Sequence, residues 1–149
     1  MSDGLEPPAR LRVLTSWQAS QLSKIGARMI ARRMPLSARS DFAVLATLEE
    51  YGPVSQADLG RRLGMDRNDV NGIVTRLQAA GHIDRQADPD DRRRNLVTIN
   101  PSGTRRLEQI QLTADEAQAE LLSALDANER RQLHALLAKA LETHKPEPA

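Results

Sequence analysis

The segment DRQADPDDRRRNLVTIN, residues Asp84–Asn100, decides how the middle of this chain folds. Both ends of the segment alternate between apolar and polar residues, as β-strands with one buried face do. The centre gathers acidic residues, a proline and three consecutive arginines. The pattern predicts a β-hairpin, with strands over about His82–Ala87 and Leu96–Asn100 and an unusually long, charged tip between them.

Apolar residues at helical spacing lie on both sides of this hairpin. Proline or glycine ends several of the predicted helices, and Ser37, Ser55, Asp66 and an Asp126–Glu129 capping box are suited to begin four of them. We expect helices over residues 10–34, 37–51, 55–63, 67–80, 101–124 and 127–144. The core must be mainly aliphatic, because the chain has only one tryptophan, one tyrosine and one phenylalanine.

Composition restricts the class of protein. The 149 residues are 40% hydrophobic and 28% charged, which is ordinary for a globular domain with its own core. No apolar stretch approaches the ~20 residues of a membrane span, and no signal peptide is visible. The absence of cysteine excludes disulfides, thiol catalysis and cysteine-bound metals, and it fits a cytoplasmic protein. We expect flexible termini at 1–9 and 145–149.

Charge is unevenly distributed, although the formal net charge is only +1. Residues 55–106 contain ten arginines and seven aspartates, a net charge of +3. Residues 107–149 contain four basic and eight acidic residues, a net charge of −4. A basic middle followed by an acidic tail favours a nucleic-acid contact in the middle of the chain.

The order of elements in that basic region is a helix, a short helix, a glycine turn, a helix and a hairpin. This is the order of a winged helix-turn-helix, in which the second helix of the pair enters the DNA major groove. Amides can bond adenine, arginine can grip guanine, and the threonine methyl can touch thymine. The alternative is an ordinary solvated helix face. The polar face of the predicted recognition helix carries Arg67, Asn68, Asn71, Gly72, Thr75 and Gln78.

Residues Ser55–Gly103 closely resemble the MarR family of bacterial transcription regulators. The strongest match is DPDDRRRNLVTINPSG, residues 88–103, which is similar to the family pattern D-P-x-D-x-R-x-x-x-V-x-L-T-x-x-G. Asp91, Arg93, Val97 and Gly103 are in register with it, and Ile99-Asn100 replaces the usual Leu-Thr. RLQAAGHIDR, residues 76–85, is similar to the end of the family's recognition helix and its first wing strand. The resemblance extends over about residues 10–144.

The resemblance implies a mainly α-helical fold with a small β-hairpin wing and a helical dimerisation base. We expect a single domain over 1–149, with dimerisation regions at 10–34 and 101–144 and a winged helix-turn-helix lobe at 37–100. A homodimer would place two recognition helices about one DNA turn apart, roughly 34 Å, on a palindromic operator. The expected function is sequence-specific DNA binding by a transcriptional repressor that a small aromatic or anionic effector releases.

Two other classes of function remain open. A winged helix can bind another protein without an operator of its own, and sequence-dependent DNA binding would separate the two. A small enzyme would need an acid/base or metal cluster. His82, His134 and His144 are scattered, and no catalytic arrangement stands out. We therefore expect no enzyme activity, no metal and no cofactor.

The wing arginines Arg92, Arg93 and Arg94 are predicted to contact phosphates or an A·T-rich minor groove. Asp91 is predicted to order the tip by pairing with the Arg93 guanidinium. In the recognition helix, Asn71-Gly72 replaces the Thr/Ser-Arg that the family often has. Glycine costs ~1 kcal/mol in a helix interior relative to alanine, so a close approach of the backbone to DNA or to a neighbouring helix is one explanation, and drift is another.

The only tryptophan, Trp17, allows two interpretations of its role. Packing in the core or a dimer interface is one. The other is the wall of an effector pocket, because Arg12 and Gln21 lie at nearby helical spacings and relatives in the family bind small aromatic acids. Under the second reading, the effector-binding residues are Arg12, Trp17 and Gln21.

Overall fold

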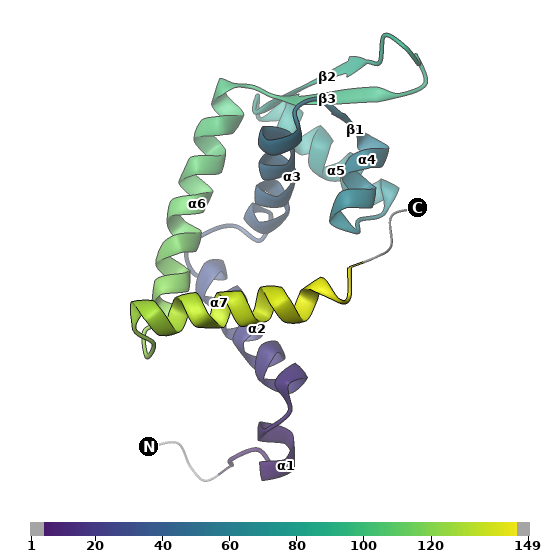
Figure 1. The fold of residues 1–149 in the computed structure, drawn as a ribbon. Helices are drawn as coiled ribbons and strands as arrows, with labels where there is room; N and C mark the ends of the chain where they lie inside the picture. Colours follow the sequence, from purple (N-terminus) through teal and green to yellow (C-terminus); the bar gives the residue numbers. More distant parts are fainter. Residues whose placement is uncertain (1–4, 146–149) are drawn as a thin grey trace. The chain divides into compact units, whose positions relative to one another are not determined.

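The computed structural model describes residues 5–145, which form seven helices and three short strands (Figure 1). The mainly helical fold with a small β-hairpin wing is confirmed. The elements are α1 (Ala9–Arg12), α2 (Thr15–Ala31), α3 (Ala38–Tyr51), β1 (Val54–Ser55), α4 (Gln56–Leu63), α5 (Arg67–Ala79), β2 (Ile83–Ala87), β3 (Asn95–Ile99), α6 (Pro101–Leu121) and α7 (Ala127–Glu142).

Contacts divide the chain into two compact units. One contains residues 30–115, and the other contains residues 1–29 and 116–149, of which 5–29 and 116–145 are described. The first unit, which we call the lobe, is larger than the predicted 37–100, because residues 30–36 and residues 101–115 of α6 group with it. Leu107 and Ile110 on that part of α6 are buried.

The lobe contains an antiparallel sheet in the order β1–β3–β2. The hairpin register pairs Ile83 with Ile99 and Ala87 with Asn95, close to the predicted strands. Strand β1, which pairs Val54 with Val97 on the other side of β3, was not predicted. A strand of two residues is too short to show alternation, so its formation depends on the position of β3.

The helix-turn-helix pair begins and ends as local sequence dictates. Ser55 caps α4 by accepting the Asp58 backbone N–H at 3.1 Å, and Gly64 follows α4 in the left-handed conformation with φ 63°. Gly60 is also required, because a Cβ there would lie 2.9 Å from the Met65 carbonyl oxygen. Asp66 caps α5 by accepting the Asp69 backbone N–H at 2.9 Å. The turn between the helices is therefore tight and well anchored.

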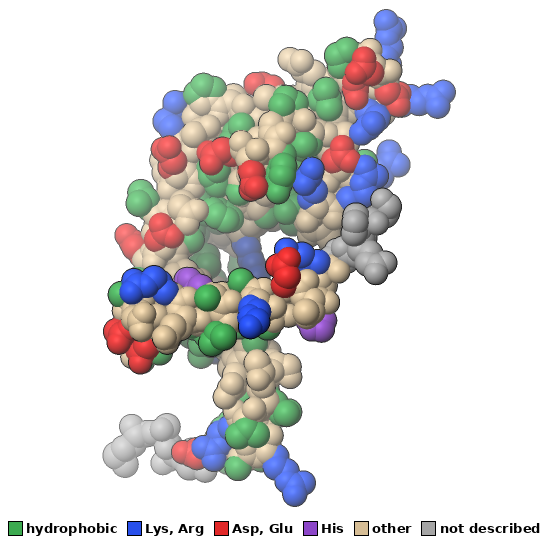
Figure 2. All heavy atoms as spheres, viewed as in Figure 1, with side chains coloured by type: hydrophobic (Ala, Val, Ile, Leu, Met, Phe, Trp, Pro, Cys, Tyr) green, Lys and Arg blue, Asp and Glu red, His purple; other side chains and the backbone are tan. Residues whose placement is uncertain are grey.

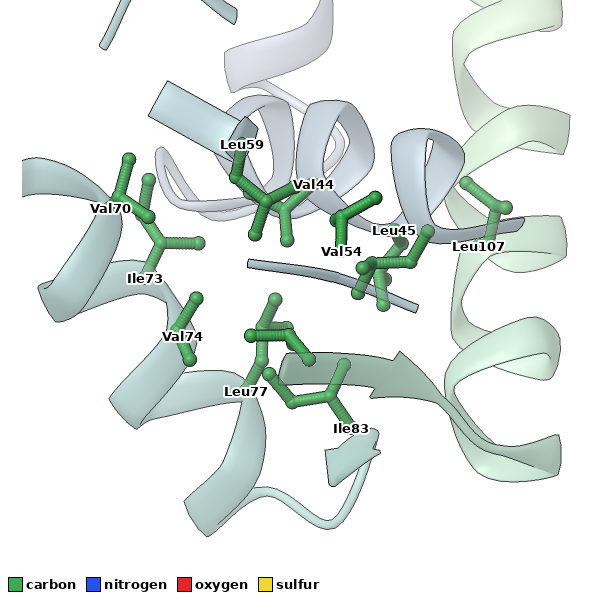
Figure 3. Close-up of a cluster of buried hydrophobic side chains, with 12 residues drawn as sticks. Val44, Leu45, Val54, Leu59, Val70, Ile73, Val74, Leu77, Ile83 and Leu107 are labelled. Atoms are coloured by element: carbon green, nitrogen blue, oxygen red, sulfur yellow. The ribbon is translucent and has the colours of Figure 1, made fainter. Parts of the chain in front are cut away.

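An aliphatic core holds α5 in place (Figure 3). The predicted apolar stripe of α5, Val70, Ile73, Val74 and Leu77, is buried as expected. It packs in one cluster with residues from α3, α4, the sheet and α6, including Val44, Leu45, Leu48, Leu59, Ile83, Val97 and Leu107. Burial of each large aliphatic side chain contributes roughly 1.5–3 kcal/mol, so the opposite face of α5 is presented on a rigid support.

One predicted helix is interrupted, and one predicted helix cap is wrong. The first helix is interrupted after Arg12, and the Gln18 side chain donates to the Arg12 carbonyl oxygen at 2.8 Å. The apolar spacing continues through this break, so periodicity did not reveal it. Ser37 does not cap α3 through its side chain, because its backbone is helical (φ −68°, ψ −20°) rather than extended. The α7 capping box of Asp126 and Glu129 is confirmed.

The second unit leaves much of its apolar surface uncovered. Gly26 and Leu121 approach closely, since a Cβ on Gly26 would lie 3.3 Å from the Leu121 side chain. Helix α7 has no buried residue, although Leu133 is half-buried. The most exposed large apolar side chains of this unit are Leu5, Val13, Leu14, Leu136 and Leu141. Of the predicted flexible termini, residues 1–4 and 146–149 lie outside the described residues.

Candidate nucleic-acid interface

The face of α5 opposite the core is polar and open. The predicted contact residues Arg67, Asn68, Asn71, Gly72 and Thr75 are all exposed, as is Gln78. They follow one another along the helix at spacings of one or three residues, so they share one side. The structure therefore brings the predicted recognition residues together on a single exposed surface.

An ion pair between a partly exposed arginine and a buried carboxylate connects this helix to α3. Arg76 contacts the carboxylate of Asp41, whose side chain is only 8% exposed, and its guanidinium also lies 3.5 Å from the Ser40 hydroxyl. A carboxylate buried this deeply is destabilising unless it is paired. The pair thus fixes α5 relative to α3. This ion pair was not predicted from the sequence. An aspartate on the apolar, buried side of α3 is the feature that indicates it.

Two residues of the polar face are oriented by neighbouring elements. Arg85 on β2 donates to the Thr75 hydroxyl at 3.1 Å, and Gln56 at the start of α4 lies 3.5 Å from the Asn71 amide oxygen. Since both Asn71 and Thr75 remain exposed, these contacts position the side chains without covering them. Gln56 and Arg85 were not predicted as site residues, because their partners are 15 and 10 residues away in sequence.

The wing tip, residues 88–94, is ordered by two aspartates. Asp91 accepts the backbone N–H of Arg93 at 3.0 Å, and Asp88 accepts that of Asp90 at 2.9 Å. The backbone N–H groups of Asp88 and Arg94 also close turns within the tip. The predicted pairing of Asp91 with the Arg93 guanidinium is wrong, since the carboxylate binds the backbone instead. A short aspartate side chain reaches its own turn more easily than a guanidinium.

Arg92 and Arg93 extend from this ordered tip. Both are exposed, and within residues 5–145 neither guanidinium has an ion-pair or hydrogen-bond partner. Figure 2 shows basic side chains projecting at the end of the hairpin. Two uncompensated cations on a rigid projection are suited to a polyanion.

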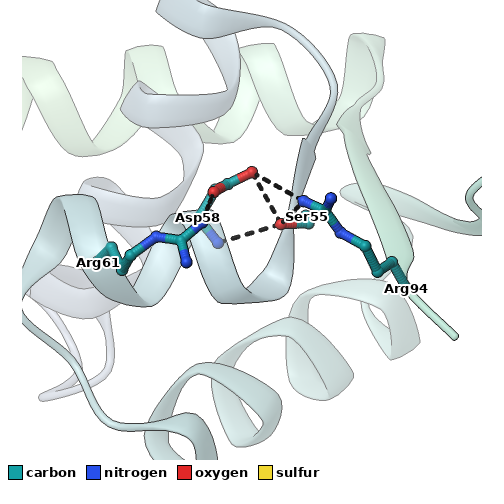
Figure 4. A network of polar contacts seen from close by, with 4 residues as sticks. All are labelled: Ser55, Asp58, Arg61 and Arg94. Atoms are coloured by element: carbon teal, nitrogen blue, oxygen red, sulfur yellow. Dashed lines mark hydrogen bonds and ion pairs between the residues drawn. The ribbon is translucent and has the colours of Figure 1, made fainter. Parts of the chain in front are cut away.

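Arg94 differs from its neighbours, because it turns toward the base of the wing (Figure 4). Its guanidinium donates to the Ser55 hydroxyl at 3.1 Å and lies 3.4 Å from an Asp58 carboxylate oxygen. The same carboxylate accepts the Ser55 hydroxyl at 2.9 Å and contacts Arg61. The predicted contact of Arg94 with DNA stays a prediction, but unlike Arg92 and Arg93 this arginine is held within the chain. It ties the wing to the start of α4.

This network also sets the charge of Asp58. The hydrogen bond from Ser55 lowers the pKa of the Asp58 carboxyl below its ordinary value, and Arg61 lowers it further through a hydrogen bond and its charge. Partial burial opposes this shift, and Arg94 adds a smaller favourable charge effect. Asp58 is consequently ionised at neutral pH and keeps both arginines engaged.

A hollow of about 1010 Å³ separates α5 from the wing base. Its lining includes four arginines, Arg61, Arg67, Arg93 and Arg94, and one aspartate, Asp66. Asn68 and Asn71 line the same hollow from α5. Excess positive charge beside amide side chains is an arrangement suited to a phosphate backbone and the base edges next to it.

The hairpin is joined to α6 by a close backbone approach at Gly103. A Cβ at this position would lie 2.1 Å from the His82 carbonyl oxygen and 2.7 Å from an Ile99 side-chain carbon. Asn100 accepts the Gly103 backbone N–H and donates to the Gly81 carbonyl oxygen, each at 2.9 Å. Only glycine fits this crossing, which explains why the wing motif ends in one.

The predicted effector residues lie in the other unit. Trp17 and Gln21 are half-buried on α2, whereas Arg12 ends α1 beyond the helix break and pairs with Glu6 at 3.0 Å. They are therefore not arranged along one continuous helix, and none of them lines the hollow beside α5. Within residues 5–145 there is no group of three residues suited to hold a metal, and no helix that would span a membrane.

Known proteins share this arrangement. The model of the MarR family matches residues 34–94. The multiple antibiotic resistance protein MarR of Salmonella typhimurium is 31% identical over 103 residues, which cover 68% of this chain and 72% of that protein. The chain belongs to the MarR family. This MarR-family chain is also 32% identical over 102 residues to the transcriptional repressor NicR of Pseudomonas putida, covering 68% of the chain and 65% of NicR.

The fold of this chain is similar to that of a solved structure over nearly the whole length of the solved chain. BpsR of Bordetella bronchiseptica, described as having its DNA binding regulated by 6-hydroxynicotinic acid, is 26% identical with a TM-score of 0.71. The match covers 84% of this MarR-family chain and 96% of that chain. Among curated relatives the match is shorter, because this chain spans 65%, 65% and 62% of the length of three of them.

Proposed function

We propose that this MarR-family protein is a transcriptional regulator that binds operator DNA as a homodimer. The observation that carries the proposal is the pairing of two surfaces in one lobe. Helix α5 presents an open polar face of Asn68, Asn71 and Thr75, and the adjacent wing presents Arg92 and Arg93, whose guanidinium groups have no partner among the described residues. The helix supplies base contacts, and the wing supplies phosphate or minor-groove contacts.

The dimer in this proposal is built by residues 10–34 and 101–144. The support is the uncovered apolar surface of α7, where Leu136 and Leu141 are 66% and 65% exposed. Apolar surface of this kind is normally covered in a stable protein. A two-fold dimer places two recognition helices on two half-sites of a palindrome.

Repression and release by a small aromatic or anionic compound complete the proposal. NicR is a repressor by name, and the DNA binding of BpsR is regulated by an aromatic acid. The contact residues that we propose are Arg12, Trp17 and Gln21. An anionic effector must displace Glu6 from Arg12, because the two are paired. Quenching of Trp17 fluorescence by 6-hydroxynicotinic acid, lost in Arg12→Ala, would support this site; unchanged quenching would place the pocket elsewhere.

The function itself is tested by selection of bound duplexes from a randomised library. We expect a palindromic consensus with half-sites about one helical turn apart. Equal affinity for the selected duplex and a scrambled one of the same composition would contradict the proposal. It would favour the alternative, a winged helix that binds another protein.

A further inference from the structure

Gly72 has no structural reason to be glycine. It lies in the interior of α5, where glycine weakens a helix relative to alanine. Its φ is not positive, and a Cβ added there would meet no atom within 4 Å. A close approach to a neighbouring helix, one of the explanations that the sequence allowed, is therefore wrong. A partner that requires the absence of a side chain at Gly72 therefore lies outside the described residues.

The surface around Gly72 is hollowed. A recess of about 430 Å³ has Met65, Gly72 and Ile73 in its lining, and Met65 and Asn68 also line the larger hollow beside the wing. Met65 is half-buried and Ile73 is buried, so the floor of the recess is apolar. The outer surface of the recognition helix thus has an apolar depression at the place where a base edge would lie.

The charges at this recess exclude a phosphate. Arg76, the one cation in its lining, is paired with the buried Asp41 carboxylate. Asp69 also lines the recess and is exposed, which leaves an acidic rim. The larger hollow has the opposite character, with four arginines in its lining. A phosphate is therefore attracted to the wing side of α5 and repelled from the Gly72 side.

We propose that Gly72 is a specificity-determining residue, and that the recess it forms accepts the C5 methyl group of a thymine in each operator half-site. This inference rests on the proposed DNA-binding function. The thymine methyl is the only apolar group that an unmodified base presents in the major groove. The missing Cβ lets that methyl approach the helix backbone, between the amide of Asn68 and the methyl-bearing Thr75.

The test removes the methyl from the DNA and adds one to the protein. Each thymine of the selected operator is replaced in turn by uracil, in both half-sites, and binding is measured for wild type and Gly72→Ala. At one thymine, wild type should lose roughly fourfold in affinity per half-site, the value of one buried methyl group. Gly72→Ala should bind the thymine operator less tightly and should lose less than twofold on uracil substitution, because its own methyl takes the place beside the helix backbone that the thymine methyl would fill.

Controls separate the loss of the uracil effect from misfolding and from a thymine contact made by Thr75. Gly72→Ala should raise Tm by roughly 2–8 °C, since alanine stabilises the helix and nothing clashes. Thr75→Ser removes a methyl but keeps the hydroxyl that Arg85 contacts, and it should leave the response at this thymine unchanged. No other described glycine is both helical and free of neighbours, so the uracil duplex is the matched control.

Each outcome has one meaning. A weaker thymine operator and a lost uracil effect in Gly72→Ala support the inference. Equal responses of wild type and Gly72→Ala at every thymine would overturn it, as would transfer of the effect to Thr75→Ser, while sequence-selective binding itself would still stand. If no duplex is selected over scrambled DNA, the proposed function fails, and the inference falls with it.

Discussion

Arg94→Ala tests whether the wing is held by α4 rather than by its own turn. The substitution removes the hydrogen bond to the Ser55 hydroxyl at 3.1 Å and the contact with Asp58 at 3.4 Å. A net hydrogen bond contributes about 0.5–1.5 kcal/mol. A partly exposed ion pair contributes about 0.2–1 kcal/mol, and Arg94 is 46% exposed at its side chain.

Together these contacts predict a loss of roughly 1–2 kcal/mol in the free energy of unfolding. Ser55 is not left unsatisfied, because its hydroxyl still bonds the Asp58 carboxylate and the Asp58 backbone N–H. For a domain of this size the loss corresponds to a fall in Tm of roughly 2–8 °C. Thermal unfolding followed by circular dichroism measures it directly.

Arg92→Ala is the matched control, since it removes a neighbouring arginine that has no partner within residues 5–145. It should leave Tm within about 1 °C, as exposed surface substitutions usually do. Equal Tm values for wild type and Arg94→Ala would show that these contacts do not stabilise the wing. An Arg92→Ala variant as unstable as Arg94→Ala would also contradict the prediction, because the wing would then be stabilised at its tip.

Three further predictions concern other parts of the chain. The lowered pKa of Asp58 means that its carboxylate stabilises the fold above about pH 3.9, the ordinary aspartate value, and that this contribution is lost as pH falls through the folded-state pKa. The difference in free energy of unfolding between wild type and Asp58→Asn, measured by urea unfolding, should therefore shrink on acidification. A difference that stays constant with pH would contradict a lowered pKa for Asp58. Gly103→Ala should destabilise by at least about 1–3 kcal/mol, because its Cβ would lie 2.1 Å from the His82 carbonyl oxygen; an unchanged Tm would show that the crossing relaxes. Leu136→Glu with Leu141→Glu should convert a species of twice the 16.5 kDa chain mass into a monomer in sedimentation; a wild type that already sediments as a folded monomer would refute the proposed dimer.

Local signals explain why the helix-turn-helix pair was predictable from the sequence. Asp66 and Gly64 determine where α5 begins by bonds and backbone angles within a few residues. The buried stripe of α5 repeats at helical spacing, so its exposed face follows from the same pattern. The long gapped wing motif identified the family before any contact was known.

Contacts between distant residues were beyond such signals. Arg94 meets Asp58 across 36 residues, and Arg76 meets Asp41 across 35. In the sequence, each of these four charged residues cannot be distinguished from a charged residue on a solvated helix face. Three consecutive arginines therefore seemed equivalent, although the structure directs one of them inward. In the case of Gly72, only the structure shows that no neighbour accounts for its lack of a side chain.

In the proposed function, the recognition helix supplies specificity and the wing supplies affinity for any duplex. The most direct test is the salt dependence of binding to the selected operator and to a scrambled duplex. Three proteins are compared: wild type, Asn68→Ala, and a wing variant that combines Arg92→Ala with Arg93→Ala. The wing variant should lose affinity for both duplexes, with the slope of log K against log salt falling by about one unit per lost phosphate contact. Asn68→Ala should lose roughly 1–3 kcal/mol per lost base contact on the operator alone. Unchanged affinities and slope in the wing variant, or an equal loss on both duplexes in Asn68→Ala, would contradict the account.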